Sequence, residues 1–430
     1  MKTNKGRNIT FVHTPCPELD DDRVEPPQGI LSLASFMKEN QIPCQICDLS
    51  GVPEEDWRSS LSAGDVYGFS TYSVNYHRTL RIRDIAKSIN PDAITIAGGP
   101  HVSGIPRDCA KDFDVIIRGE AELALLDVMG RIQGGESVAG IFQADPVADL
   151  DQLPFPDYGM IDIRSYHRIV EGLPSISIVS SRGCPYNCPF CNSRVFSRGK
   201  LRFRSPGNVV REIRQLMDRY GTRTFRFNDD LFTFSPDRIA EMTAALKPLN
   251  ILYRVFARSS SMTRQAAEQL YESGCRHVAI GTEHMAAKML EILKQKTTQQ
   301  DNIEALKNCK RAGLKVRIYL LLGFPGETEE TIRESISVLL DCEFDEFIVY
   351  AFIPYPGTAM WSSPEIWGAE IVDRDFSKYL QVGRERRTCF AVKTDGADGF
   401  TPDDVRRWRQ MTIDALEKKA LWAGKSPDNR

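Results

Sequence analysis

The chain has 430 residues, of which 42% are hydrophobic and 26% charged, and its net charge is −3. The length favours two domains and a tail, and the composition is ordinary for a globular protein. The slightly acidic charge argues against a nucleic-acid-binding protein. The first residues, MKTNKGRNITFVHT, indicate neither a signal peptide nor a membrane span, and 11 scattered cysteines favour reduced thiols in the cytoplasm.

Residues 1–146 are predicted to form an α/β domain around a doubly wound, Rossmann-like parallel sheet. Five strand-like segments, NITFVHT, PCQICDL, DVYGFST, AITIAGG and DVIIRGE, alternate with segments of helical periodicity. In the first helical segment, Ile30, Leu33, Ala34 and Met37 fall on one face. Near-continuous apolar strands indicate a sheet that is covered on both faces, and such a sheet binds its ligand at the carboxyl ends of its strands.

Small residues and turns follow these strands, in the segments FSTYSVNYHRTL, AGGPHVSG and IRGEAE. They leave room for a broad, flat ligand that backbone amides can face. The candidate binding residues in these segments are Ser70, Ser73, Gly98, Gly99 and Glu120.

A Pro- and Asp-rich linker is predicted at residues 147–170, and a crowded cysteine loop follows it. The stretch SSRGCPYNCPFCNSR holds Cys184, Cys188 and Cys191. Packing of small thiols is disfavoured because Gly and Pro mark a loop. Structural zinc usually has four protein ligands, and no second Cys/His pair at suitable spacing follows. A [4Fe–4S] cluster, with one iron open to a non-protein ligand, is the favoured alternative.

Residues 171–362 are predicted to form a second α/β domain. Six strand-like segments, SISIVS, TFRFND, ILYRVFAR, HVAIGTE, KVRIYLLLGF and EFIVYAFI, alternate with helix-like stretches. Repeated βα units predict a parallel sheet whose ligands gather at the C-terminal ends of its strands. The last segment, residues 363–430, contains Trp367 and Trp408 and a helix that Thr401 can cap. We expect it to cover the barrel mouth or to pack against it.

The Cys-x3-Cys-x2-Cys spacing, with Phe190 before the last cysteine, resembles the signature of the radical S-adenosylmethionine (SAM) superfamily. This resemblance implies a partial (β/α)6 TIM barrel and a single [4Fe–4S] cluster whose open iron chelates SAM. It also implies reductive cleavage of SAM to a 5′-deoxyadenosyl radical.

The same resemblance implies roles for polar residues at the strand ends. Asn228, Asp229 and Asp230 stand where many members have a Gly-Gly-Glu motif that holds the SAM amino group, although a role of Asp229 or Asp230 as a solvated turn residue is an equal alternative. Arg258 can pair with the SAM carboxylate or form a structural ion pair. Glu283 can accept hydrogen bonds from the ribose hydroxyls.

Residues at the ends of the fifth and fourth strands are also expected to have specific roles. Gly323 and Gly326 permit close backbone approach to an adenosine, and Glu327 is expected to cap the next helix. His284 is expected to be a satisfied structural histidine rather than a proton carrier.

The N-terminal segments EPPQGILSLASF, GGPH and IRGEAE resemble those of cobalamin-binding radical SAM proteins. The chain lacks Asp-x-His-x-x-Gly, the motif of enzymes that ligate cobalt through a histidine. The resemblance therefore implies cobalamin bound without a protein histidine below cobalt, although His77 and His101 lie near the expected pocket. The alternative is a vestigial domain that has lost the cofactor.

These observations predict an enzyme that methylates an unactivated carbon of a small molecule, such as a natural product, with the help of cobalamin. Radical rearrangement, ring contraction or elimination on a sugar-like substrate is the alternative within this class, and a non-catalytic cofactor-binding protein is the alternative outside it. We expect an electron donor such as flavodoxin or ferredoxin, and no nucleic-acid or membrane partner.

Overall fold

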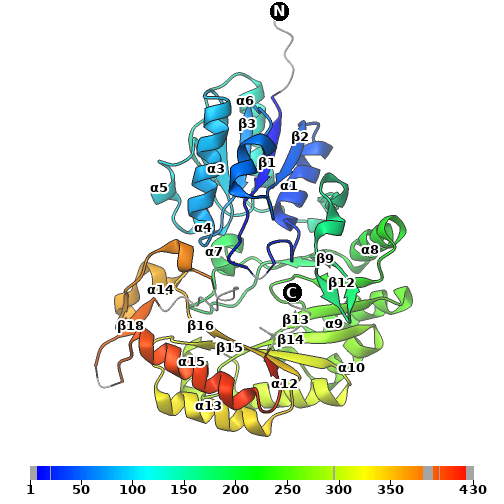
Figure 1. Ribbon diagram of the computed structural model, residues 1–430. Helices are drawn as coiled ribbons and strands as arrows, with labels where there is room; N and C mark the ends of the chain where they lie inside the picture. The colour runs from blue at the N-terminus through cyan, green and yellow to red at the C-terminus, as the bar shows by residue number, and fades with distance from the viewer. Residues whose placement is uncertain (1–6, 20, 294–295, 381–390, 397, 423–430) are drawn as a thin grey trace, which may run out of the picture.

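The computed structural model describes residues 7–19, 21–293, 296–380, 391–396 and 398–422. Each half of the chain is built around a parallel sheet. In Figure 1 the N-terminal sheet, blue to cyan, lies above the open face of the larger sheet, green to red. None of the described helices is both long and apolar enough to cross a bilayer.

The N-terminal sheet has six parallel strands in the order β2-β1-β3-β4-β5-β6. They are β1 (Ile9–His13), β2 (Cys44–Asp48), β3 (Val66–Ser70), β4 (Ile94–Gly98), β5 (Val115–Ile117) and β6 (Gly140–Phe142). The first five confirm the predicted strands, and β6 is an addition. Strand β1 lies between β2 and β3, so the order of the strands reverses beside β1, as in a doubly wound sheet. Sheets of this type bind ligands outside the carboxyl ends of their strands.

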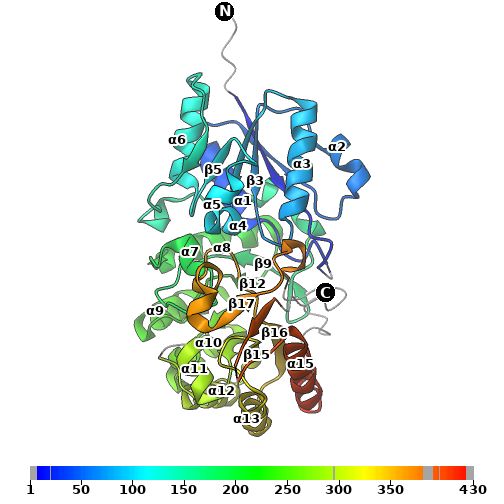
Figure 2. The same ribbon diagram turned by 90° about the vertical axis from the view of Figure 1, so that its left-hand side faces the viewer.

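Helices cover both faces of this sheet, and Figure 2 shows α3 and α6 on opposite sides of it. One apolar core joins α1 (Gln28–Glu39) and α6 (Glu122–Gln133) to the sheet. The other core joins α2 (Trp57–Ser60), α3 (Tyr76–Ile89), α4 (Pro100–Gly104) and α5 (Pro106–Cys109). On α1, Ile30, Ala34 and Met37 are buried and Leu33 is half-buried, as the helical periodicity predicts.

The larger sheet is an incomplete barrel of seven parallel strands in the order β19-β16-β15-β14-β13-β12-β9. The strands are β9 (Ile176–Ile178), β12 (Thr224–Phe227), β13 (Leu252–Ala257), β14 (Cys275–Glu283), β15 (Lys315–Leu322), β16 (Glu346–Ala351) and β19 (Leu421–Trp422). The first six confirm the predicted partial TIM barrel. The two-residue strand β19 comes from the far end of the chain and pairs with β16.

Six helices pack on the outer side of the barrel strands: α8 (Pro206–Tyr220), α9 (Pro236–Leu246), α10 (Arg264–Glu272), α11 (Ala287–Leu293), α12 (Gln299–Arg311) and α13 (Glu329–Asp341). Most begin at a side-chain cap, because the hydroxyl of Ser205, Ser235, Thr263, Thr298 or Thr328 accepts a backbone N–H of the first turn. Such caps satisfy otherwise unpaired amides and contribute about 1 kcal/mol each.

Short elements connect the domains and frame the cysteine loop. The linker contains short 3-10 turns at Leu150–Gln152, Tyr158–Met160 and Ile163–Ser165, followed by the hairpin β7 (Ile169–Val170) and β8 (Leu173–Pro174). Strands β10 (Ser181–Arg182) and β11 (Arg202–Phe203) pair on either side of the cysteine loop and α7 (Ser193–Ser197).

The C-terminal segment packs against the side and the rim of the barrel. It contains α14 (Ala359–Ser362), the hairpin β17 (Ala369–Ile371) and β18 (Val392–Thr394), and α15 (Pro402–Leu416). Thr401 caps α15 through a capping box with Asp404, which confirms the predicted cap. Helix α15 contacts α13 and β16 and buries Trp408.

Candidate cofactor sites

A cavity of about 410 Å³ lies between the two domains. Its N-terminal wall comes from α1 and from the carboxyl ends of β3, β4 and β5, and its other wall comes from residues 177–183, 192–197 and 228–230 of the barrel. The carboxyl ends of both sheets therefore meet at one cavity, where both folds are expected to bind ligands.

Glycines leave much of the cavity surface without side chains. The glycines that line the cavity include Gly29, Gly68, Gly98, Gly99 and Gly119 of the N-terminal wall and Gly183 of the barrel wall. Gly99 has φ +99°, and a Cβ there would lie 2.7 Å from Thr71 N and 2.8 Å from Thr71 O. Only glycine fits this position, because both the backbone conformation and the neighbouring strand exclude a side chain. A Cβ on Gly29 would meet no atom within 4 Å, so that wall is open toward the cavity.

The N-terminal candidate residues divide into two groups. Ser70, Gly98, Gly99 and Glu120 line the cavity, whereas Ser73 does not. The Ser73 hydroxyl instead lies 3.0 Å from His101 Nδ1, and both side chains are buried. Ser73 therefore contacts His101 of α4 and is not part of the cavity wall.

The two histidines near the expected pocket do not line the cavity. His101 lies between Tyr76 and Phe376, with ring centroids 4.2 and 4.7 Å away, and its contact with Phe376 is edge-to-face. Burial lowers the pKa of His101 to about 4. His77 lies on the exposed side of α3. Cobalt ligation without a protein histidine remains a prediction.

The cysteine loop joins β10 to α7 at the barrel end of the cavity. Cys184 and Cys188 are half-buried and Cys191 is exposed. Gly183 before them has φ +89°, and a Cβ would lie 2.2 Å from Lys200 O, so the entry to the loop requires glycine. No three His, Cys, Asp or Glu side chains in the described parts of the chain converge as ligands of a single metal ion.

Strand β12 is followed by the amide Asn228 and by two carboxylates, Asp229 and Asp230. Asp229 is buried, and its Oδ1 accepts hydrogen bonds from Ser180 N, Ser180 Oγ and Ser181 Oγ at 2.9, 3.1 and 2.6 Å. Burial raises the pKa of Asp229 to about 6. Asn228 lines the cavity, and its Nδ2 donates to Glu25 Oε1 at 2.9 Å. Among the described residues, Asn228 Oδ1 and Asp229 Oδ2 have no hydrogen-bond partner.

Arg258 directly follows β13, and Glu283 ends the neighbouring strand β14, so both lie at strand ends as predicted. Arg258 is 4% exposed, lies over the Tyr186 ring at 3.9 Å and places Nη1 4.0 Å from Cys188 Sγ. Glu283 is half-buried at a β-bulge between β14 and β15, with φ +60°. A non-glycine residue in this left-handed conformation is unusual and is found preferentially at functional sites.

The expectations for the fifth strand end need correction. Glu327 does not cap α13, because Thr328 does. The buried Glu327 carboxylate instead lies 3.0 Å from His284 Nε2, and this confirms His284 as a structural histidine. A Cβ on Gly323 would lie 2.8 Å from Val405, and one on Gly326 would lie 3.0 Å from Ile292. Packing and their positive φ angles explain both glycines, and their contact with an adenosine remains a prediction.

Sequence reasoning missed the charged contacts that join the domains at the cavity. Arg182, two residues before Cys184, bonds to Glu120 and Glu122. Glu120 also pairs with Arg202 and is 6% exposed, so its carboxylate is already satisfied. Glu25 reaches across to Arg168 Nε at 2.8 Å. The acidic residues beside the strand ends can be recognised in the sequence, but their pairing cannot, because their arginine partners lie 60 or more residues away.

Comparison with known proteins matches both halves of the chain to protein families. The profile of the B12 binding domain matches residues 22–129, and that of the Radical SAM superfamily matches residues 178–339. The chain is a radical SAM protein with a B12-binding domain. These two domains imply a [4Fe–4S] cluster, SAM and cobalamin as its cofactors.

Relatives of this radical SAM protein match most of the chain. An uncharacterized methyltransferase of Pyrococcus horikoshii is 28% identical to this chain, and the alignment covers 78% of each of the two chains. The anaerobic magnesium-protoporphyrin IX monomethyl ester cyclase of Rubrivivax gelatinosus is 26% identical over 82% of this chain and 68% of its own. The structure of the radical SAM methyltransferase TsrM from Kitasatospora setae, with cobalamin and a [4Fe–4S] cluster bound, has a TM-score of 0.67 at 17% identity, covering 86% and 81% of the two chains.

The residues of the radical SAM protein fit these cofactors. The glycine-lined wall at Gly29, Gly98 and Gly99 leaves a broad surface for cobalamin. The three thiols share one loop, and thiolates are the ligands that hold iron–sulfur clusters. The unsatisfied oxygens of Asn228 and Asp229, at the end of β12, are suited to accept hydrogen bonds from an ammonium group.

Proposed function

We propose that this protein is a cobalamin-dependent radical SAM methyltransferase that adds a methyl group to a carbon atom of a small organic molecule. The observation that carries this proposal is the shared cavity. Gly98 and Gly99 of the N-terminal sheet line it together with Gly183 and Asn192, which flank the cysteine loop. A cobalamin on the N-terminal wall and a cluster in the loop would therefore open onto the same space.

The relatives support methyl transfer as the reaction. The similar proteins include, besides those above, the cytidylyl-2-hydroxyethylphosphonate methyltransferase of Streptomyces wedmorensis and the bacteriochlorophyllide d C-12(1)-methyltransferase of Chlorobaculum tepidum, at 25% and 23% identity. Their named substrates differ widely, so the resemblance supports the reaction class and leaves the substrate open. The proposal assigns cobalamin to residues 1–146, the linker to 147–170, radical chemistry to 171–362 and a packing role to 363–430.

When bound, the cluster and SAM supply a carbon-centred radical, and cobalamin supplies a transferable methyl group. Cys184, Cys188 and Cys191 would hold the cluster as thiolates. Arg258, next to Cys188, would bind the SAM carboxylate, and Glu283 would accept hydrogen bonds from the ribose. Asn228 and Asp229 would accept hydrogen bonds from the SAM ammonium group. The walls of the cavity would exclude water and stray hydrogen donors from the reacting carbon.

The proposal extends to partners and location. Reduction of the cluster requires a one-electron donor, and a flavodoxin or a ferredoxin is suitable. The described cysteines form no disulfides, which supports a cytoplasmic location.

The test is an anaerobic reaction of the reconstituted protein with SAM that carries a deuterated methyl group. Methyl transfer predicts that the label appears in the product, together with S-adenosylhomocysteine and 5′-deoxyadenosine. If 5′-deoxyadenosine forms alone and the substrate loses water or cyclises, the alternative of elimination or rearrangement is correct. A protein that cannot be loaded with cobalamin would have a vestigial N-terminal domain, and methyl transfer would be excluded.

A further inference from the structure

Arginines line the interior of the barrel below the shared cavity. Arg226 on β12, Arg254 on β13 and Arg317 on β15 are 9%, 4% and 1% exposed. Arg226 and Arg254 are directly paired in the sheet. Alternate residues of a strand point to one face, so Arg226 shares its face with Asn228, which lines the cavity. We call Arg226 and Arg254 the arginine pair.

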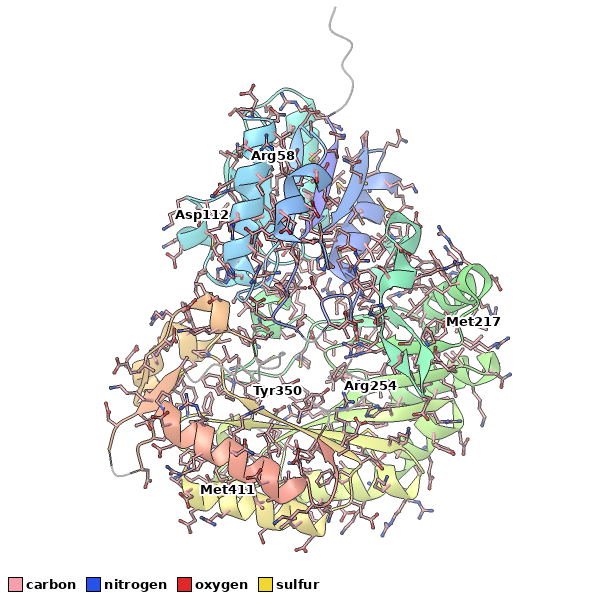
Figure 3. All side chains as sticks on the ribbon, viewed as in Figure 1. Arg58, Asp112, Met217, Arg254, Tyr350 and Met411 are labelled. Atoms are coloured by element: carbon pink, nitrogen blue, oxygen red, sulfur yellow. The ribbon has the colours of Figure 1, made fainter. Side chains whose placement is uncertain are left out.

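Aromatic rings accompany the arginine pair. Both guanidinium groups lie over the Phe256 ring, at 5.5 Å for Arg226 and 5.4 Å for Arg254. Arg254 Nη2 donates to the Tyr319 hydroxyl at 3.0 Å, and Tyr319 stacks on Tyr350. Figure 3 shows Arg254 and Tyr350 rising from the concave face of the sheet toward the N-terminal domain. Phe256, Tyr319 and Tyr350 are each only half-buried, so this face is accessible inside the barrel.

The pair keeps hydrogen-bond donors without acceptors. Within the described residues, Nε and Nη1 of Arg226 and Nε of Arg254 are buried and have no hydrogen-bond partner. Glu25 Oε2 is 3.7 Å from Arg226 Nη1, which is an ion-pair distance but too long for a hydrogen bond. No described carboxylate lies within ion-pair distance of Arg254. Buried donors of this kind normally have partners, and unsatisfied ones call for a ligand or a functional explanation.

The positive charge around the pair exceeds the negative charge. Among the described residues, Arg168 bonds to Glu25 at 2.8 Å and Arg317 bonds to Glu346 at 2.5 Å. Arg226 has the longer ion pair with Glu25, so four arginines share these two carboxylates. Burial, followed by the Arg254 guanidinium, lowers the pKa of Arg226 to about 9. His277 adds no charge, because burial and then Arg254 hold its pKa well below the ordinary value. An anion would relieve this unbalanced charge.

We propose that Arg226 and Arg254 bind an oxyanion group of the substrate, a carboxylate or a phosphate, and so hold the substrate inside the barrel below the cavity. This inference rests on the proposed function, since it names the substrate class of the same site. A guanidinium group offers paired donors that match either oxyanion, and the half-buried rings of Phe256, Tyr319 and Tyr350 would contact the apolar part of the molecule.

The SAM carboxylate is a poorer occupant of this position. Arg258 directly follows β13, four residues after Arg254, and it lies beside Cys188 in the cysteine loop. Four residues of extended strand place Arg254 about 13 Å deeper in the barrel. SAM held near the cluster would therefore meet Arg258 first and leave the arginine pair to a second molecule.

The test uses two probes, radiolabelled benzoate and inorganic phosphate, in equilibrium dialysis with the anaerobically reconstituted full-length protein. Saturating SAM is present throughout. We expect one saturable site for at least one probe, and the preferred probe identifies the oxyanion. Arg226→Gln and Arg254→Gln should each weaken binding at least tenfold. The control variant Arg264→Gln, whose side chain is 76% exposed and paired with Glu268, should bind as the wild type does.

Two further measurements keep the outcomes separate. Arg254→Lys retains the charge with fewer donors and should bind with intermediate affinity, which provides a test if a glutamine variant does not fold. Production of 5′-deoxyadenosine is measured on the same samples, so that failure of SAM cleavage counts against the proposed function and not against anion binding. Absence of saturable binding in the presence of SAM, or equal binding by all variants, would overturn the inference.

Discussion

Arg182 Nη1 lies 3.1 Å from Glu120 Oε2 and 2.6 Å from Glu122 Oε1, and these contacts join the two domains beside the cysteine loop. Arg182 is two residues before Cys184, whereas Glu120 follows the β5 strand of the N-terminal sheet. Glu120 is 6% exposed and also pairs with Arg202. The position of the loop therefore depends on a carboxylate of the other domain.

Replacement of Glu120 by Gln should loosen this junction. The change preserves shape but removes the charge, so the half-buried side chains of Arg182 and Arg202 lose their charge-assisted bonds to this residue. We expect the free energy of unfolding to fall by about 1.5–3 kcal/mol, measured as a lower denaturant midpoint. Asp145→Asn is the matched control, because Asp145 pairs with Arg198 but its side chain is 77% exposed. That control should change stability by less than about 1 kcal/mol. Equal effects of the two variants would contradict the role given to Glu120.

The three loop cysteines should be required together for the cluster. Replacement of Cys184, Cys188 and Cys191 by Ala removes the thiolate ligands, so the brown absorption and all SAM cleavage should disappear. Replacement of the buried Cys275, Cys309 and Cys342 by Ala serves as the control and should leave the iron content unchanged. A triple loop variant that still reconstituted about four irons per chain would place the cluster elsewhere.

SAM affinity should depend on Glu283 and Arg258. Glu283→Gln keeps the size of the side chain but loses charge-assisted bonds worth about 1.5–3 kcal/mol. SAM binding should weaken by about tenfold to a hundredfold in this variant and in Arg258→Ala. Glu272→Gln is a suitable control, because its carboxylate lies on the surface, paired with Lys247. Unchanged affinity in both site variants would show that other residues bind SAM.

Acid should destabilise the N-terminal domain through His101. Burial lowers its pKa to about 4, whereas an unfolded histidine titrates near 6.5. The unfolded state therefore binds more protons between these values, and stability is lost as the pH falls through this window. At pH 5 the loss is about 2 kcal/mol.

His101→Phe removes this titration while keeping a ring between Tyr76 and Phe376. The melting temperature of the cluster-free variant should therefore fall less between pH 7 and pH 5 than that of the wild type. His167→Gln is the control, because the His167 side chain is 58% exposed. Identical pH dependence of His101→Phe and the wild type would show that His101 is not the acid-sensitive group.

Much of the architecture could be predicted from the sequence because apolar strands and helical periodicity are local signals. Strand β19 could not, since two residues gain a strand conformation only by pairing with β16, about 75 residues earlier in the chain. Local patterns also misassigned Glu327, because the sequence does not show that a buried histidine lies opposite it.

The sites were predictable to a different extent. The cysteine spacing is a local motif, and strand ends at Ser70, Gly98 and Asn228 lead to the cavity by topology alone. The left-handed conformation of Glu283 and the partners of Glu120 depend on tertiary contacts. The arginine pair did leave a signal, because TFRF and LYRVFA each place an arginine inside an otherwise apolar strand. Such a charge in a buried strand usually has a functional or paired role.

The cavity has walls from both domains, so a molecule that contacts both walls binds only when the domains are docked. Its binding energy is then linked to docking: a ligand at a hundred times its dissociation constant stabilises the docked form by about 2.7 kcal/mol. The loaded protein should unfold as one cooperative unit. Without the ligand, the two halves are held by the linker and by contacts such as Arg182–Glu120, His101–Phe376 and Leu31 in the barrel core, and they should melt at a lower temperature.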